Sequence, residues 1–270
     1  MAATVVFPES TQEALGQLAA LEGAAPLAGG TWIMRAPLRG ETMAHAYVSL
    51  ARVQALREVE VAGGLRIGAC VTHSALAAAL ADRPAFAGLR DAAGRSANPA
   101  VRQVATVGGA LATAAFPASD IVTALLALDA EVELAGVRGQ ETVPLAGYLQ
   151  ARGGAFAGLV TAVVVPVPPG RSAHVRLTQR SGGDYPVAIV SVAVGAGGAV
   201  RVAIGSVEPV PRRWEALEAA LAADVDEAAA TAAALLDDTN PRDAVDAPGW
   251  YRAQVLPSLV RRAVAGLEGV

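Results

Sequence analysis

The sequence contains one cysteine, Cys70, and few aromatic side chains, which make up 4% of its 270 residues. A single cysteine excludes a disulfide within the chain and a cysteine-ligated zinc or iron–sulfur site. Any metal redox centre would therefore belong to a partner. Cys70 itself falls in an expected strand, where we interpret it as a small buried hydrophobic residue.

Basic clusters and metal-ligand patterns are also missing. The net charge is −4, and basic residues gather only in short pairs such as Arg212–Arg213, so we expect no nucleic-acid partner. His45, His73 and His174 have no acidic or histidine neighbour at a ligand spacing, and we interpret them as surface or hydrogen-bonded polar residues. No nucleophile motif of the G-x-S-x-G type occurs. We therefore predict no metal site and no catalytic side chain.

Hydrophobic residues make up 53% of the chain, yet no apolar run reaches the roughly 20 residues that a membrane-spanning helix needs. The most apolar stretch, from Pro186 to Gly205, is interrupted by glycines and Arg201. Its β-branched residues alternate, which predicts a buried hairpin with Gly195–Gly198 as the turn. The N-terminal residues lack the pattern of a secretory leader, so we expect no membrane span and a cytoplasmic location.

The first part of the chain, to about residue 55, predicts a small α/β unit. Helical spacing of leucines follows an N-cap at Ser10 or Thr11, and "APLAGGT" predicts a strand that runs into a glycine turn. A second α+β unit extends to about Val167. It has a hairpin that turns at Gly63–Gly64 and a helix capped by Ser119 or Asp120.

A proline-rich stretch at residues 164–172 is the best candidate for a domain boundary, because consecutive prolines stiffen the chain. Beyond it we expect a three-stranded sheet backed by helices. The helical parts are an alanine-rich stretch over residues 213–236 and one final helix that begins near Gly249.

Two glycine pairs, Gly29–Gly30 and Gly108–Gly109, are expected at strand ends. Adjacent glycines let a backbone approach a ligand and present successive N–H groups, an arrangement that suits a diphosphate. Thr31 and Thr113 are candidate hydroxyl donors. Neither pair fits the Rossmann or P-loop pattern, and an isolated glycine pair is more often a turn than an anion site. From the residues alone, both interpretations stay open.

Three ordered motifs, "PLAGGT", "NPAVRQVATVGGALATAAFPASDIVTALLALDA" and "RLTQRSGGDYPVAIVSVAV", resemble the FAD-binding medium subunit of molybdenum hydroxylases. This family includes carbon monoxide dehydrogenase and xanthine dehydrogenase, and the similarity extends over nearly the whole chain. The resemblance implies an α+β fold with an FAD-binding domain at residues 1–167, like that of vanillyl-alcohol oxidase (PCMH type). Its subdomains would span about 1–55 and 56–167, and a smaller α/β domain with a three-stranded sheet and helices would occupy 173–270.

The resemblance also implies which residues hold FAD, without a covalent link. The first loop would wrap the diphosphate, the second loop would lie opposite, and an acidic residue would close the second motif. The residues carried over are Ala28, Gly29, Gly30, Thr31, Trp32, Ile33, Thr106, Val107, Gly108, Gly109, Ala110, Thr113, Asp120, Val160 and Arg176.

This chain departs from the family pattern in three places. Ala110 stands where the family usually has asparagine, and the run from Gly109 to Pro117 is one residue longer than usual. After the proline-rich stretch, His174 and Arg176 stand where the family commonly has tyrosine and lysine. The carboxylate of Asp120 has a second possible role, since an aspartate at the start of an apolar helix is favourable without any ligand.

The function that the resemblance implies is electron transfer. FAD would receive electrons from iron–sulfur clusters on a small partner subunit and pass them to an external acceptor, while substrate would be oxidised at a molybdenum cofactor on a large partner. The assembly would be a dimer of heterotrimers. Two alternatives remain: a scaffold subunit that has kept the fold but lost the flavin, and a stand-alone flavin oxidase.

Overall fold

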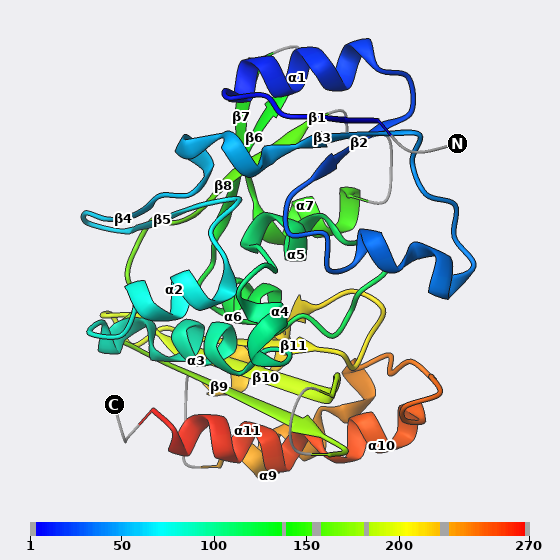
Figure 1. Cartoon of the computed structure of the whole chain (residues 1–270). Helices are drawn as coiled ribbons and strands as arrows, with labels where there is room; N and C mark the ends of the chain where they lie inside the picture. The colour runs from blue at the N-terminus through cyan, green and yellow to red at the C-terminus, as the bar shows by residue number, and fades with distance from the viewer. Residues whose placement is uncertain (1–3, 137–138, 153–157, 181–183, 222–226, 268–270) are drawn as a thin grey trace.

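The structure is a computed structural model that describes residues 4–136, 139–152, 158–180, 184–221 and 227–267. The described residues form three sheets, which follow one another along the chain; in Figure 1 the first two lie in the upper half of the view and the third in the lower half. Helices fill the spaces between the sheets and cover the outer face of the third sheet. A sheet must bury its apolar face against another element. The described residues accordingly form three clusters of buried apolar side chains.

The first sheet is parallel, in the order β1 (Thr4–Val6), β3 (Ala46–Ser49) and β2 (Ala24–Leu27). Helix α1 (Thr11–Ala20) connects β1 and β2, and the Ser10 hydroxyl caps it by accepting a hydrogen bond from the Glu13 amide. The expected helix and the expected strand ahead of the first glycine pair are confirmed. After β2 the chain passes the first glycine pair and enters a 3-10 helix, η1 (Ile33–Arg39).

The second sheet is antiparallel and has five strands in the order β4-β5-β8-β6-β7. The Gly63–Gly64 turn between β4 and β5 and the Ser119 cap of α6 are as predicted. The bounds of the strands are β4 (Val59–Val61), β5 (Leu65–Gly68), β6 (Glu131–Gly136), β7 (Gly139–Pro144) and β8 (Leu159–Val165). Those of the helices are η2 (Leu50–Arg52), η3 (Gln54–Leu56), α2 (His73–Ala79), η4 (Pro84–Phe86), α3 (Ala87–Arg95), α4 (Pro99–Arg102), α5 (Val107–Ala112), α6 (Asp120–Ala127) and α7 (Leu145–Ala151).

The third sheet is antiparallel, and the expected hairpin with its turn at Gly195–Gly198 is confirmed. The expectation of three strands is wrong, because a two-residue strand adds a fourth; so short a segment has no periodicity to recognise. The order is β12 (Arg212–Arg213), β11 (Val200–Gly205), β10 (Pro186–Val194) and β9 (Arg171–Thr178).

Helices α8 (Glu215–Leu221), α9 (Ala228–Ala234), η5 (Leu236–Asp238), α10 (Gly249–Gln254) and α11 (Leu256–Ala265) complete the chain. The expectation of one final helix is wrong, because the helix is interrupted at Val255. Pro257 lies in the first turn of α11, where its missing N–H costs nothing, whereas a continuous helix would need that donor.

The third sheet is packed against the second unit by close backbone contacts. A Cβ on Gly205 of β11 would lie 2.1 Å from the Thr123 hydroxyl oxygen of α6, and one on Gly88 of α3 would lie 3.0 Å from the Ala173 backbone of β9. Only glycine permits such distances. The sheet therefore lies between α3 and α6 on one face and α8 and α11 on the other, and α9 packs against α11 (Figure 1).

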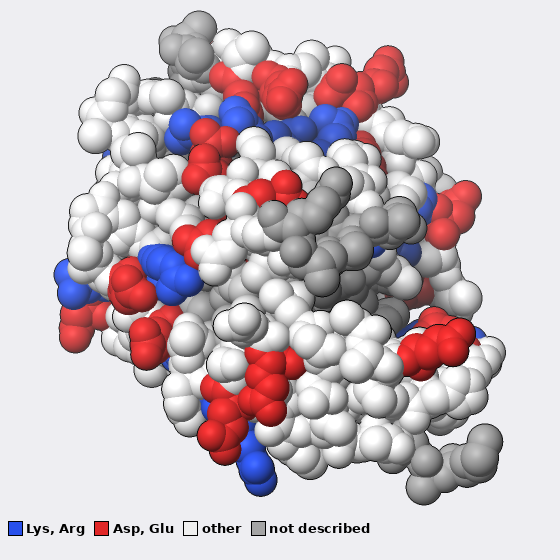
Figure 2. Space-filling model, turned by 90° about the horizontal axis from the view of Figure 1, so that it is seen from above, with Lys and Arg blue, Asp and Glu red and all other residues white. Residues whose placement is uncertain are grey.

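Within the described residues, no helix is both long and apolar enough to cross a bilayer. The sequence contains no lysine, so the basic side chains in Figure 2 are all arginines. On the face that Figure 2 shows, they are interspersed with acidic side chains. Many of these arginines form ion pairs with the neighbouring carboxylates, such as Arg66 with Glu133 at 2.8 Å.

A cavity between the two glycine loops

A cavity of about 920 Å³ lies where the first sheet, the second sheet and the third sheet meet. A volume of this size is in the range of pockets that hold a large organic ligand. Segments from all three sheets line it, including the residues after β2, the start of α5, and Asp184–Pro186 ahead of β10. Every predicted site residue lines this cavity except Val107, which is fully buried in the core of the second unit.

The first glycine loop leaves a run of main-chain donors unused. Gly30 has a φ of +69°, and the chain then turns into η1. Among the described residues, no acceptor is found for the amide N–H groups of residues 29–33. Consecutive unpaired amides that line a cavity make an anion-binding concavity. This segment therefore has a geometry that suits a diphosphate.

The second glycine loop differs from its prediction in two ways. It does not follow a strand: Gly108 and Gly109 lie in the first turn of α5, which Thr106 caps. Its amides are also already bonded, Gly108 N–H to the Ala69 carbonyl at 2.8 Å and Gly109 N–H to the Thr106 hydroxyl at 3.2 Å. The Thr113 hydroxyl donates to the Gly109 carbonyl at 2.7 Å, so its proton is committed as well. This loop forms part of the cavity wall and offers few free N–H or O–H donors.

The two loops nevertheless meet. A Cβ on Gly29 would lie 1.9 Å from the Val104 carbonyl oxygen and 3.1 Å from the Ala105 Cα, so the first loop touches the chain just before the second. On the second loop, a Cβ on Gly108 would lie 2.6 Å from the Cβ of Ala69. Each pair thus has one glycine that the packing of the chain itself demands.

An aromatic cluster from three distant segments also lines the cavity. Trp32 and Phe116 lie 5.1 Å apart between ring centroids, and Phe116 and Tyr185 lie 5.0 Å apart, edge to face. The Arg39 guanidinium lies 4.1 Å from the Trp32 ring centroid, a cation–π geometry. Tyr185 follows residues 181–183, a predicted glycine-rich turn that lies outside the described residues. The cluster places Tyr185 of the third unit against the first glycine loop.

Asp120 is nearly fully buried where α6 begins, and it faces two side chains of β9. His174 Nε2 lies 3.1 Å from Asp120 Oδ1, and Arg176 Nε lies 3.4 Å from the same oxygen. The terminal nitrogens of Arg176 donate to the carbonyls of Arg95 and Asp184. Arg176 therefore holds neighbouring chain segments together as well as lining the cavity.

His73 and Cys70 are among the cavity residues that were not predicted as part of the site. His73 Nδ1 lies 2.8 Å from the Ser96 hydroxyl, while Nε2 has no hydrogen-bond partner among the described residues. Burial lowers the pKa of His73 to about 4, against the opposing effects of the Asp120 carboxylate and the Thr106 carbonyl, so the ring is neutral at pH 7. Burial also raises the pKa of the Cys70 thiol to about 11. Neither residue belongs to a sequence motif, and only the fold brings them to the cavity.

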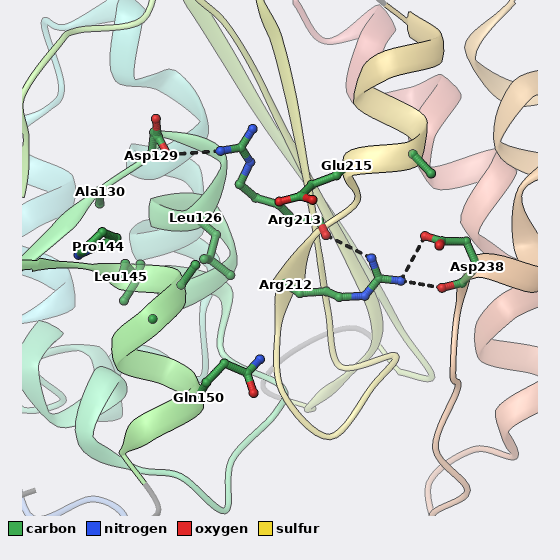
Figure 3. A pocket seen from close by; sticks show the side chains of 13 residues that line it. Leu126, Asp129, Ala130, Pro144, Leu145, Gln150, Arg212, Arg213, Glu215 and Asp238 are labelled. Carbon is green, nitrogen blue, oxygen red and sulfur yellow. Dashed lines mark hydrogen bonds and ion pairs between the residues drawn. The ribbon is translucent and has the colours of Figure 1, made fainter.

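A second cavity, of about 600 Å³, lies between α7 and α8 (Figure 3). Its two arginines form ion pairs with carboxylates that line the cavity or lie beside it. Arg213 bonds Asp129 at 3.1 Å and Glu218 at 2.5 Å, and Arg212 bonds Glu208 at 2.9 Å. Because these cations are already neutralised, the second cavity presents an ion-pair network that joins two units of the chain rather than a site for an anion.

The fold and the larger cavity define a flavoprotein of the class whose backbone loops hold a dinucleotide. Comparison with known families agrees with this class. Residues 1–168 match the model of the FAD binding domain in molybdopterin dehydrogenase, and residues 173–267 match that of the CO dehydrogenase flavoprotein C-terminal domain. The chain belongs to this family, the FAD-binding medium subunits of molybdenum hydroxylases, and is a subunit of an oxidoreductase.

Relatives with known activities are similar over almost their whole length. The chain is 27% identical to the glyceraldehyde dehydrogenase medium chain of Sulfolobus acidocaldarius, over 96% of this chain and 95% of that one. It is 28% identical to the nicotine 6-hydroxylase medium subunit of Paenarthrobacter nicotinovorans, over 95% and 94%. The reconstituted CO dehydrogenase from Oligotropha carboxidovorans matches with a TM-score of 0.87 and 28% identity, over 100% of this chain and 98% of that chain.

The described residues fit FAD as a ligand. The unpaired amides of the first loop are donors that a diphosphate accepts from, and the missing side chains of the glycine pairs leave the cavity open beside them. The aromatic cluster supplies an apolar surface for a ring system.

Proposed function

We propose that this chain binds FAD without a covalent link in the larger cavity and carries electrons between an iron–sulfur partner and an external acceptor. FAD, when bound, supplies the redox chemistry. The observation that carries the proposal is the run of unpaired amides at residues 29–33 beside a cavity of about 920 Å³. The protein contributes position, shape and electrostatics.

The residues divide this task by the groups that they present. The amides after Gly29 would hold the diphosphate, and the α5 wall at Gly108 and Gly109 would lie against it. Asp120 would accept from a hydroxyl or amine of the ligand, since a carboxylate can only accept. Ala110 offers no side-chain hydrogen bond, in contrast to the asparagine that is usual at this position.

The proposed partners follow from the absence of metal ligands in the sequence and from the family. A small subunit with iron–sulfur clusters would deliver electrons, and a large subunit with a molybdenum cofactor would oxidise the substrate; we propose a dimer of heterotrimers in the cytoplasm. Within this chain, residues 1–167 would form the FAD-binding domain, with subdomains of about 1–55 and 56–167. Residues 173–270 would form the C-terminal domain.

A flavin-free scaffold is the second candidate, favoured by Ala110 and by the bonded amides of the second loop. The two are separated by purifying the chain, recording its visible spectrum, and titrating the protein with FAD while following flavin fluorescence. Bound FAD, released on denaturation, is expected. A colourless chain that also fails to quench added FAD would exclude the electron-transfer proposal and leave the scaffold.

Partner binding is tested by isolating the tagged chain from its native cells and analysing the co-purifying proteins for iron and molybdenum. Both metals are expected in stoichiometric amounts with two additional polypeptides. A chain that is isolated alone and oxidises a substrate by itself would instead be a stand-alone flavin oxidase.

A further inference from the structure

The carboxylate of Asp120 is held in the cavity wall by a residue of the third sheet. Asp120 begins α6, whereas His174 lies on β9, and the two side chains are 3% and 1% exposed. Behind the histidine, Ser191 of β10 lies with its hydroxyl oxygen 2.8 Å from His174 Nδ1. The three side chains form one chain of contacts that runs from the cavity wall into the third sheet.

We propose that His174 is a positioning residue that orients the Asp120 carboxylate toward the bound nucleotide. The inference rests on the proposed function, because it needs a nucleotide in the larger cavity. It gives the third sheet a part in cofactor binding beyond forming a wall.

The hydrogen-bond pattern supports this role. His174 Nε2 carries the hydrogen of its contact with Asp120 Oδ1, because a carboxylate only accepts, and Nδ1 lies 2.8 Å from the Ser191 hydroxyl oxygen, so both ring nitrogens have a partner. Within the described residues, no donor is found for Asp120 Oδ2, and Asp120 lines the cavity. One oxygen is thus held by the protein, and the other is available to a ligand.

The neighbouring arginine does not replace this contact. Arg176 Nε is 3.4 Å from Asp120 Oδ1 and forms no hydrogen bond, because the guanidinium is turned toward the Arg95 and Asp184 carbonyls. Arg176 therefore compensates the charge of the carboxylate without fixing its direction. The direction comes from His174.

The chemistry of a carboxylate also limits what it recognises. An ionised carboxylate accepts hydrogen bonds and repels phosphate oxygens. The group that Asp120 holds is accordingly a hydroxyl of a sugar portion, or an N–H of a ring, and the diphosphate lies elsewhere, at the first loop. Misdirecting the carboxylate should therefore weaken nucleotide binding without abolishing it.

A matched pair of substitutions separates the two contacts of His174. In His174→Gln the longer amide reaches Asp120, as Nε2 does. In His174→Asn the shorter amide superposes on Nδ1, so it keeps Ser191 and leaves Asp120 unheld. We expect the dissociation constant of FAD for the full-length apoprotein, measured by fluorescence quenching, to rise at least tenfold in His174→Asn and to stay within about threefold of wild type in His174→Gln.

A double-mutant cycle with Asp120→Asn tests whether His174 acts through Asp120. Adding His174→Asn to Asp120→Asn should change FAD affinity by less than twofold. The proposal would be overturned if the losses of FAD affinity from the two single substitutions multiplied in the double variant. Equal FAD affinities for His174→Asn and His174→Gln would also overturn it. A purely structural role for His174 predicts losses that follow the unfolding midpoint instead, so the midpoint is measured for every variant.

The outcomes also distinguish this inference from the proposed function. His45→Gln changes an exposed histidine outside the cavity and should bind FAD as wild type does. If wild type and His45→Gln both fail to bind FAD, the proposed function fails. If they bind and His174→Asn binds equally well, only the role of His174 is refuted.

Discussion

The two glycine loops share a dipeptide and a cavity but use their glycines differently. In the first loop, the amides of residues 29–33 stay unpaired, and Gly30 adopts a left-handed conformation. In the second, Gly108 and Gly109 lie in a capped helical turn whose amides are bonded. The comparison shows that a glycine pair can serve in two ways. It can supply free N–H donors, or it can let two chain segments pack closely because no side chain lies between them.

The loops are also alike in one respect, since each contains a glycine with no room for a side chain. Gly29 faces the backbone of Val104, and Gly108 faces Ala69. The second members, Gly30 and Gly109, have more space. Substitutions of Gly29, Gly108 and Gly109 should therefore separate the effects on folding from the effects on ligand binding. They are given below, together with the effect of acid on His73, in order of decreasing loss of unfolding free energy.

Gly29→Ala should have the largest effect. Its Cβ would lie 1.9 Å from the Val104 carbonyl oxygen, so the two loops must separate, at a cost of about 3 kcal/mol or more. Urea denaturation measures this loss. Gly16→Ala, in α1 with open space around it, is the control and should be neutral or stabilising. Equal stabilities for the two variants would show that the loops are not in contact.

Acid should act on the second loop through His73, whose amide N–H donates to the Ala105 carbonyl. The imidazole of His73 binds a proton below about pH 6.5 in the unfolded chain, but only near pH 4 in the folded chain. The contribution of His73 to the free energy of unfolding is therefore complete above pH 6.5 and is lost as the pH falls. The loss amounts to about 3 kcal/mol by pH 4. Urea denaturation from pH 7 to pH 4 should show a flatter profile for His73→Gln; parallel profiles would contradict this account.

Gly108→Ala should cost about 2 kcal/mol, because its Cβ meets the side chain and carbonyl of Ala69 and α5 must shift outward. FAD affinity should fall only to the extent that α5 is displaced. A variant with wild-type stability would mean that α5 does not pack against Ala69 as described. Gly109→Ala is the matched control in the same turn, where the added Cβ meets only the Thr106 hydroxyl.

Gly109→Val should have the smallest effect on stability and a large effect on binding. The Thr106 hydroxyl, 2.9 Å from the added Cβ, must move, at a cost of about 1 kcal/mol for the weakened cap. The remaining methyl groups project beside the cavity and should abolish FAD binding, as measured by fluorescence titration. If the purified variant is still yellow, the second loop does not border the flavin.

The sequence predicted the local elements that depend on local chemistry. Ser10 and Ser119 cap their helices, and the Gly195–Gly198 turn joins two alternating strands. Its errors have a local cause too. A Gly pair after "ATV" looks like a strand end, but the Thr106 cap starts a helix there, and Pro257 lies in the first turn of a new helix instead of within a continuous one.

The candidate site was predictable where the family motif specifies it and unpredictable where distant segments meet. All predicted residues except Val107 line one cavity, although their contacts with FAD stay a prediction. The pairing of Asp120 with His174 joins residues 54 positions apart, and the hydrogen bond between His73 and Ser96 joins residues 23 positions apart. Such contacts depend on how sheets pack, which no short sequence pattern encodes.

The fit of Gly205 around Thr123 has a consequence for how the polypeptide can be divided. With α3 and α6 pressed on one face of the third sheet, a fragment ending near residue 168 would expose the inner sides of both helices to water. The last hundred residues, which contain β9 to β11, would likewise lose α3 and α6, the helices that cover one face of these strands. The two halves are therefore expected to unfold together as one cooperative unit.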